Sequence, residues 1–127
     1  MGEQASTAIT GIRTVGVPVT DQDRAVAFYV DVLGLDKRFD APVEQLGGRW
    51  IEVAPAGAAT TIALVPAGPD AKPGVETGIR LTVADAAALH EKLVEHGVEV
   101  GELLRWPGVP PMFGLRDPDG NGLEVVE

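Results

Sequence analysis

A few charged side chains stand inside otherwise apolar stretches of this chain, and they are the residues best able to do chemistry. Glu124 interrupts the apolar run of the closing segment RDPDGNGLEVVE, which spans residues 116–127. An acid that points from a strand into a cavity can ligate a metal ion or act as a general base. It can equally be a polar residue with a structural partner, and the residues that share its face of the sheet decide between these roles.

The two histidines do not form a metal-binding pair. His90 and His96 fall in one expected helix, six residues apart, which corresponds to about 600° of rotation and therefore to well-separated faces. A shared ion would need the spacing i and i+4. His90 borders the apolar stripe of this helix, and His96 lies in its last turn, where partial positive charge suits the helix dipole. We interpret both as structural residues.

The elements that must position this chemistry form a unit of one strand and one helix that occurs twice. Apolar residues first alternate, as in a strand, and then recur at i, i+3, i+4 and i+7, as on an amphipathic helix. Thr20 or Asp21 can cap the first helix, and Asp85 the second. Gly34 and Gly97 suit the residue after each helix end and are 63 residues apart, half the chain. The patterned positions are Val15, Val17, Val19, Ala25, Phe28, Tyr29 and Val32, then Ile79, Leu81, Val83, Ala86, Leu89 and Leu93.

Shorter strand candidates follow each helix and are separated by turn residues. They lie at about residues 36–40, 48–54 and 59–66 in the first half and 98–103, 111–116 and 121–126 in the second. The sequence therefore predicts an α+β fold, in which one domain over residues 1–127 consists of two tandem βαβββ modules. The modules cover residues 10–66 and 76–127, and the Pro- and Gly-rich segment 67–75 links them.

Two sequence motifs, in this order and with the internal repeat, point to a known family. The segment DPDGNG predicts a tight turn between the last two strands, because Gly120 and Gly122 permit positive φ around Asn121. Together with VTDQDRAVAFYVDVLGL at residues 19–35, the terminal DPDGNGLEVVE resembles the vicinal oxygen chelate superfamily of glyoxalases, bleomycin resistance proteins and extradiol dioxygenases. The resemblance implies two curled sheets that form an open barrel around a cavity, with the helices outside.

The resemblance also implies where metal-dependent members hold their ion. The four ligand positions, on the first and last strand of each module, fall here on Thr14, Ala63, Gly78 and Glu124. Glycine and alanine offer no donor atom and a threonine hydroxyl is a weak donor, whereas divalent catalytic ions need several imidazole or carboxylate ligands. We therefore expect no cofactor. The alternative is a divalent metal in a site rebuilt around Glu124, Glu52 and further residues.

Strand alternation predicts the remaining lining of the cavity. Ile51 and Val53 take the helix-facing phase, which turns Trp50 and Glu52 toward the cavity. Trp106, in a Pro-rich segment, either caps the cavity mouth or packs on its own prolines. The expected ligand-binding residues are Trp50, Glu52, Arg80, Trp106, Met112, Arg116 and Glu124.

Arg80 and Glu124 are expected to form an ion pair. The first and last strands of a module are neighbours in the fold that the resemblance implies, and the two side chains share a face. If the pair is partly desolvated, loss of one member leaves the other charge uncompensated. A ligand carboxylate or phenolate could also compete for Arg80.

Composition narrows the classes of partner. The formal charge is −9, from 10 basic and 19 acidic residues, which opposes binding to the phosphates of nucleic acid. The apolar runs are too short for a membrane span, and no cysteine is present for disulfides or thiolate sites. We expect a cytoplasmic protein that binds neither nucleic acid nor membranes.

The sequence is compatible with three functions. The first is metal-independent binding of a small organic molecule, such as an aromatic or anionic metabolite or antibiotic. The second is an enzyme, either a glyoxalase-like lyase or dioxygenase with a rebuilt metal site, or a metal-free lyase or isomerase that uses Glu124 or Glu52 as base. The third is a subunit that only interacts with other proteins. The resemblance implies a homodimer in each case.

Overall fold

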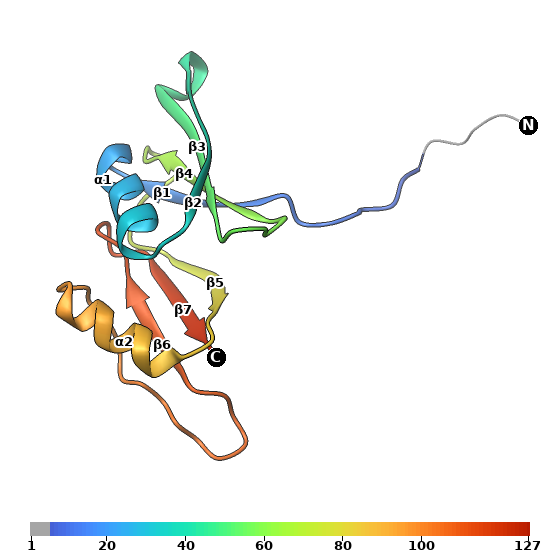
Figure 1. Ribbon diagram of the computed structural model, residues 1–127. Helices are drawn as coiled ribbons and strands as arrows, with labels where there is room; N and C mark the ends of the chain where they lie inside the picture. Colours follow the sequence, from blue (N-terminus) through green and yellow to red (C-terminus); the bar gives the residue numbers. More distant parts are fainter. Residues whose placement is uncertain (1–5) are drawn as a thin grey trace, which may run out of the picture.

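The two modules lie end to end in an elongated molecule. The computed structural model describes residues 6–127, and Figure 1 shows the first module above the second. The helices of both modules lie on the same side, and the sheets lie on the other. Residues 6–13, which precede the first strand, extend away from the sheets as an N-terminal arm. No helix within residues 6–127 is long and apolar enough to cross a lipid bilayer.

The first module is a four-stranded curved sheet with one helical segment, as the sequence predicts. Its strand order is β1-β4-β3-β2, with β1 parallel to β4 and the other neighbours antiparallel. The elements are β1 (Thr14–Val19), α1 (Gln22–Val26), the π-helical η1 (Ala27–Val32), β2 (Asp36–Val43), the 3-10 turn η2 (Glu44–Leu46), β3 (Gly48–Ala54) and β4 (Thr61–Pro66).

The second module repeats this order with a smaller sheet, β5-β7-β6. Its elements are β5 (Glu76–Thr82), α2 (Ala86–Glu95), β6 (Met112–Arg116) and β7 (Gly122–Val126). The predicted strand at 98–103 is not continuous. It touches β6 at separate points, where Arg116 N–H donates to Glu99 O, Gly101 N–H to Gly114 O, and Leu104 N–H to Met112 O. The third contact is one residue out of register with the first two, so a bulge interrupts the ladder.

Both helix starts are capped as the sequence predicts. Asp21, rather than Thr20, is the first cap, and its Oδ1 accepts from Arg24 N–H at 3.0 Å. Asp85 accepts from Ala88 N–H at 3.0 Å in the same way. Gly34 follows the first helical segment at φ 77° and Gly97 the second at φ 73°. These values lie in the left-handed region that favours glycine.

The core lies between each sheet and its helix, and strand parity is as predicted. Ile51 and Val53 are fully buried, whereas Trp50 and Glu52 on the same strand are only half-buried on the opposite face. The fold class is therefore confirmed. The barrel stays open, because no strand within residues 6–127 pairs one sheet with the other. The buried cluster includes Val17, Val19, Tyr29, Ile51, Val53, Leu64, Leu93, Phe113, Leu115 and Val125.

Candidate functional site

A pocket lies on the open face of the first sheet, which we call the first-module pocket. Its volume is about 450 Å³, and it is lined by Arg13, Arg38, Phe39, Trp50, Glu52, Ala59 and Thr61. Trp50 and Glu52 reach it because β3 buries its alternate residues against the helix. Phe39 joins them from β2, where it lies directly opposite Glu52. The pocket combines aromatic surface with a few charged groups, as small-molecule sites do.

Glu52 is held as an ionised hydrogen-bond acceptor in this pocket. Trp50 Nε1–H donates to its Oε2 at 2.7 Å, and the Thr61 hydroxyl donates to its Oε1 at 2.7 Å. The Trp50 hydrogen bond first, then that from Thr61 and the charge of Arg13, lower the pKa of the Glu52 carboxyl, although desolvation works against them. A carboxylate stabilised in this way is a good acceptor and a weak base.

A chain of hydroxyls continues from Glu52 to the family metal position on β1. Thr61 Oγ1 lies 2.8 Å from Thr14 Oγ1. A hydroxyl carries one proton, so Thr61, which gives its proton to Glu52, accepts here from Thr14. Thr14 is thereby used in a structural hydrogen bond.

The sequence did not indicate the other five residues of this pocket, which are Arg13, Arg38, Phe39, Ala59 and Thr61. Arg38 is fixed by donation from its guanidinium to Ala58 O at 2.9 Å and Pro55 O at 2.8 Å. The register between β2 and β3 shifts between Lys37 and Phe39, and such bulges leave no clear mark in a sequence. The alternation of buried and exposed residues along β3 could be read from the sequence. The residues of β2 that lie opposite them depend on this register and could not.

The predicted ion pair between Arg80 and Glu124 is present in the second module. Arg80 Nε lies 2.9 Å from Glu124 Oε2, because the two residues are register partners on the parallel strands β5 and β7. Both side chains are exposed in the single chain, 74% for Arg80 and 51% for Glu124. The pair is thus not desolvated in one chain, and an exposed pair contributes little stability.

A second pocket, the second-module pocket, opens beside this pair with a volume of about 370 Å³. Its charged lining is Glu76, Glu99, Arg116 and Glu124. Arg116 forms an ion pair with Glu76 across the start of β7. Gly122 lies beneath this pair, and a Cβ there would clash with Glu76. A side chain at residue 122 would therefore displace the ends of the Glu76 and Arg116 side chains. The expected positive φ occurs at Gly120 (81°) but not at Gly122.

Within one chain, the expected ligand-binding residues fall into two groups instead of one cavity. Trp50 and Glu52 line the first-module pocket, and Arg116 and Glu124 line the second-module pocket. Trp106 lies in neither and is 58% exposed, on the loop that projects at the lower end of Figure 1. Ligand binding by these residues remains a prediction.

The four family metal positions do not fit a divalent ion. Ala63 has no donor atom and is fully buried, and Thr14 is occupied by Thr61. Gly78 has no side chain and a φ of 75°. Glu124 lies on the other sheet from Thr14 and Ala63 and is paired with Arg80. The described part of the chain also contains no group of three or more His, Cys, Asp or Glu residues placed to hold a metal.

Both histidines have structural contacts, as the sequence predicts. His90 Nε2 lies 2.8 Å from Gly101 O and therefore donates, and its ring packs edge-on against Phe113 at 4.9 Å between centroids. His96 Nδ1 lies 2.8 Å from Lys92 O, one of the last carbonyls of α2.

Comparison with known families gives the chain an affiliation. Residues 11–125 match the model of the Glyoxalase/Bleomycin resistance protein/Dioxygenase superfamily. The chain belongs to this superfamily. It is also 34% identical over 117 residues to the uncharacterized protein YetH of Bacillus subtilis strain 168, across 89% of this chain and 94% of YetH.

Solved structures of the glyoxalase/bleomycin resistance superfamily share the whole fold. TnmS3, an antibiotic binding protein from Streptomyces sp. CB03234, is 36% identical with a TM-score of 0.83, over 95% of this chain and 98% of TnmS3. A superfamily member from Sphaerobacter thermophilus DSM 20745 is 33% identical with a TM-score of 0.85, over 94% of this chain and 98% of its own. The resemblance to the family found in the sequence is therefore confirmed.

Proposed function

We propose that this protein binds a small organic molecule in the first-module pocket and needs no metal to do so. The observation that carries the proposal is the arrangement of Trp50, Thr61 and Glu52, in which two hydrogen bonds of 2.7 Å hold a carboxylate beside an aromatic wall. Similarity to TnmS3, an antibiotic binding protein, supports the same class of ligand.

The lining indicates the chemistry of the ligand. A planar aromatic group would stack on Trp50 and Phe39, the two aromatic residues of the pocket. A hydroxyl or amine on the ligand would donate to a free lone pair of Glu52. Arg13, which also lines the pocket, offers a cation to a phenolate or carboxylate. An aromatic metabolite or antibiotic with both donor and anionic groups fits this set.

The acids of both pockets favour binding over catalysis. A general base works best when its pKa is near the working pH. Hydrogen bonds from Trp50 and Thr61 instead lower the pKa of Glu52, away from neutral pH. Glu124, the alternative base, is held by Arg80 at 2.9 Å. Metal-free lyase or isomerase activity at either acid is therefore our second choice.

We predict that Trp50 and Glu52 dominate ligand affinity. In a Trp106→Phe background, Trp50 is the sole tryptophan, and its fluorescence can be titrated with a panel of aromatic antibiotics and phenolic acids. A ligand that quenches it with saturation identifies the class. Glu52→Gln, which keeps the shape and removes the charge, should then weaken binding about tenfold, the value of one charge-assisted hydrogen bond.

A matched variant in the second module tests whether the ligand binds in the first-module pocket or in the second-module pocket. Arg116→Gln changes the second-module pocket and should leave the affinity within about twofold if the ligand contacts only the first. Unchanged affinity of Glu52→Gln, or loss of binding on removal of metal by a chelator, would contradict the proposal.

We infer that a second copy of the chain covers the open sheet faces. Ile9 and Ile12, which precede β1, are large apolar residues that are 94% and 71% exposed in one chain. The first-module pocket is rich in arginine, and the second-module pocket is rich in glutamate. Charge complementarity therefore favours a two-fold pair in which the first module of each copy faces the second module of the other.

We predict that the arm contributes to this dimer. Sedimentation equilibrium should give a dimer for the parent protein and a weaker dimer or monomer for the variant with Ile9→Asp and Ile12→Asp, because both charges would need to be desolvated. Thr7→Asp, at an exposed polar position of the same arm, is the control. A parent protein that sediments as a monomer at all concentrations would rule out the dimer.

A further inference from the structure

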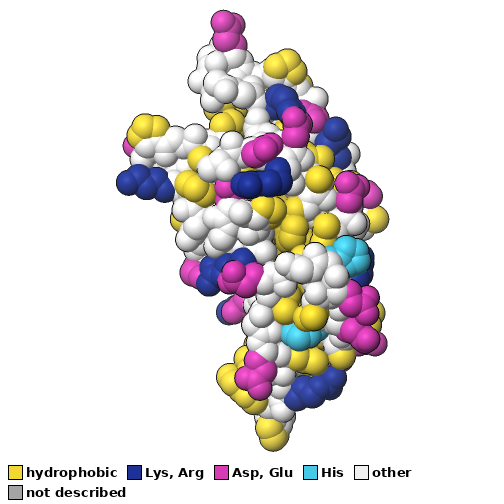
Figure 2. Space-filling model, turned by 90° about the vertical axis from the view of Figure 1, so that its left-hand side faces the viewer, with side chains coloured by type: hydrophobic (Ala, Val, Ile, Leu, Met, Phe, Trp, Pro, Cys, Tyr) yellow, Lys and Arg dark blue, Asp and Glu magenta, His cyan; other side chains and the backbone are white. Residues whose placement is uncertain are grey.

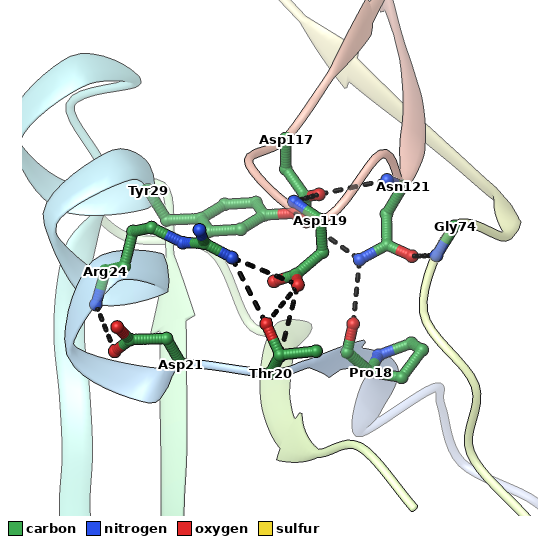
Figure 3. Close-up of polar contacts among 9 residues, drawn as sticks. All are labelled: Pro18, Thr20, Asp21, Arg24, Tyr29, Gly74, Asp117, Asp119 and Asn121. Carbon is green, nitrogen blue, oxygen red and sulfur yellow. Dashed lines mark hydrogen bonds and ion pairs between the residues drawn. The ribbon is translucent and has the colours of Figure 1, made fainter.

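One short turn ties the two modules together. Figure 3 shows this turn, residues 117–121, against the start of the first helical segment. In the chain from residue 6 onward, every hydrogen bond between the two modules ends on Asp117, Asp119 or Asn121. Because the sheets share no strand pairing there, the directional contacts between the modules are concentrated at this point.

The inner part of this contact is buried. Tyr29 donates its phenolic proton to Asp117 Oδ2 at 2.8 Å, and Asn121 Nδ2 donates to Pro18 O at 2.8 Å. Asp117 and Asn121 are 5% and 0% exposed. Asp117 Oδ1 also accepts from the backbone N–H groups of Asp119 and Asn121, both at 2.9 Å, which fixes the carboxylate within its own turn. If the modules separate, the Asp117 carboxylate loses the hydrogen bond from the Tyr29 hydroxyl. Water can replace that donor only after the contact between the modules has opened.

The outer part joins the same turn to the helix start. Asp119 Oδ1 accepts from the Thr20 hydroxyl at 2.6 Å and from Arg24 Nη2 at 3.2 Å. Asn121 Oδ1 accepts from Gly74 N–H at 2.8 Å, so the linker is held as well. The turn thus contacts a strand end, a helix start and the linker at once.

Other contacts between the modules are non-directional. The apolar core passes from one module to the other, and on the helix side a groove of about 420 Å³ separates them. Figure 2 shows this side of the molecule, where hydrophobic side chains reach the surface near its middle. Apolar contact tolerates small rotations, whereas the hydrogen bonds of the turn do not.

We propose that the turn 117–121 is the coupling element of the chain, which makes the two modules unfold as one cooperative unit. The proposal does not depend on the ligand or on the pocket. The hydrogen bonds of this turn hold the two modules in one relative position. Unfolding of either module therefore breaks buried hydrogen bonds that the other module shares.

The chain carries a reporter for each module, because its two tryptophans are Trp50 and Trp106. Single-tryptophan proteins, made with Trp106→Phe or Trp50→Phe, follow urea unfolding of one module each. With the turn intact, the two midpoints should coincide. The variant with Thr20→Val and Tyr29→Phe removes two hydrogen bonds between the modules, as well as the one from Arg24 to the Thr20 hydroxyl, and keeps the turn's own bonds. In this variant the midpoints should separate.

Two internal variants serve as matched controls. Gln22→Ala removes hydrogen bonds within the first module, and Thr77→Val removes the bond from its hydroxyl to Gly122 O within the second. Each should shift both midpoints together, because the joint is unchanged. If the double variant also shifts both midpoints together, the hydrogen bonds of Thr20 and Tyr29 to the turn do not couple the modules and the proposal is overturned.

A second measurement uses Tyr29, the sole tyrosine of the chain. Its ionisation at alkaline pH, followed by ultraviolet difference spectroscopy, reports whether the phenol has left Asp117. In Asn121→Ser, Tyr29 should ionise before tryptophan fluorescence reports unfolding. If ionisation and global unfolding stay coincident in this variant, the turn does not open separately and the proposal fails.

Discussion

At the scale of single residues, Tyr29 has the most altered acidity. Burial raises the pKa of its phenol far above the ordinary value, and the charge of Asp117 and the hydrogen bond to it act in the same direction. The native state therefore keeps this proton where the unfolded chain, with a pKa of about 10, releases it. A raised pKa contributes stability that is present below the unfolded value and is lost as pH rises above it.

We therefore predict that the protein loses stability steeply above about pH 10. Tyrosinate absorbance should appear only together with unfolding, because the native fold does not allow Tyr29 to ionise. Tyr29→Phe should be less stable than the parent at neutral pH and should lose less of its remaining stability on alkalinisation. Ionisation of Tyr29 near pH 10 in fully folded protein would contradict this account.

Glu52 illustrates how much of the site the sequence contains. Its face of β3 follows from the buried neighbours Ile51 and Val53, so its presence in the pocket was predictable. Its hydrogen bonds from Trp50 and Thr61 were not, because they depend on rotamers and on a pairing between strands. Likewise, the Arg80–Glu124 pair was predictable from the strand neighbours that the family resemblance implies, but its exposure depends on what lies above the sheet.

At the scale of elements, one side chain takes over part of a β ladder. The paired residues of β3 and β4 are limited to Glu52 with Ala63 and Val53 with Ile62. Beyond them, Gln22 from α1 inserts between the strands. Its amide donates to Arg49 O at 2.6 Å and Leu64 O at 2.9 Å and accepts from Arg49 N–H at 3.0 Å.

We predict that Gln22→Ala lowers the free energy of unfolding by about 2 kcal/mol, because it leaves partly buried backbone groups without partners. Urea denaturation measures this directly. Gln45→Ala, at an exposed position of η2, is the matched control and should change stability by less than about 0.5 kcal/mol. Equal effects of the two variants would show that Gln22 is not a structural bridge.

At the scale of the whole molecule, the repeat made the fold predictable and left the site unpredictable. Alternation and caps identify each strand and helix, and the duplication fixes their order. They do not fix how two separate sheets face each other, which decides whether Trp50 and Arg116 share a cavity. In one chain they do not, since each lies on the open face of its own module. The strand predicted at 98–103 is interrupted for a reason that the sequence does not show, since a one-residue bulge leaves the apolar pattern unchanged.

Gly78 affects how easily a metal-ligating residue could be introduced into this fold. It occupies a family ligand position in β5 with φ 75°, at a point where the pairing of β5 with β7 is irregular. A histidine or glutamate introduced there must either take up a left-handed conformation, at a penalty of about 1 kcal/mol or more, or rebuild the strand. Metal binding at this position would therefore carry a backbone penalty in addition to the exchange of side chains. For protein engineering, the backbone at residue 78 should be rebuilt into an extended conformation before a metal-ligating side chain is introduced there.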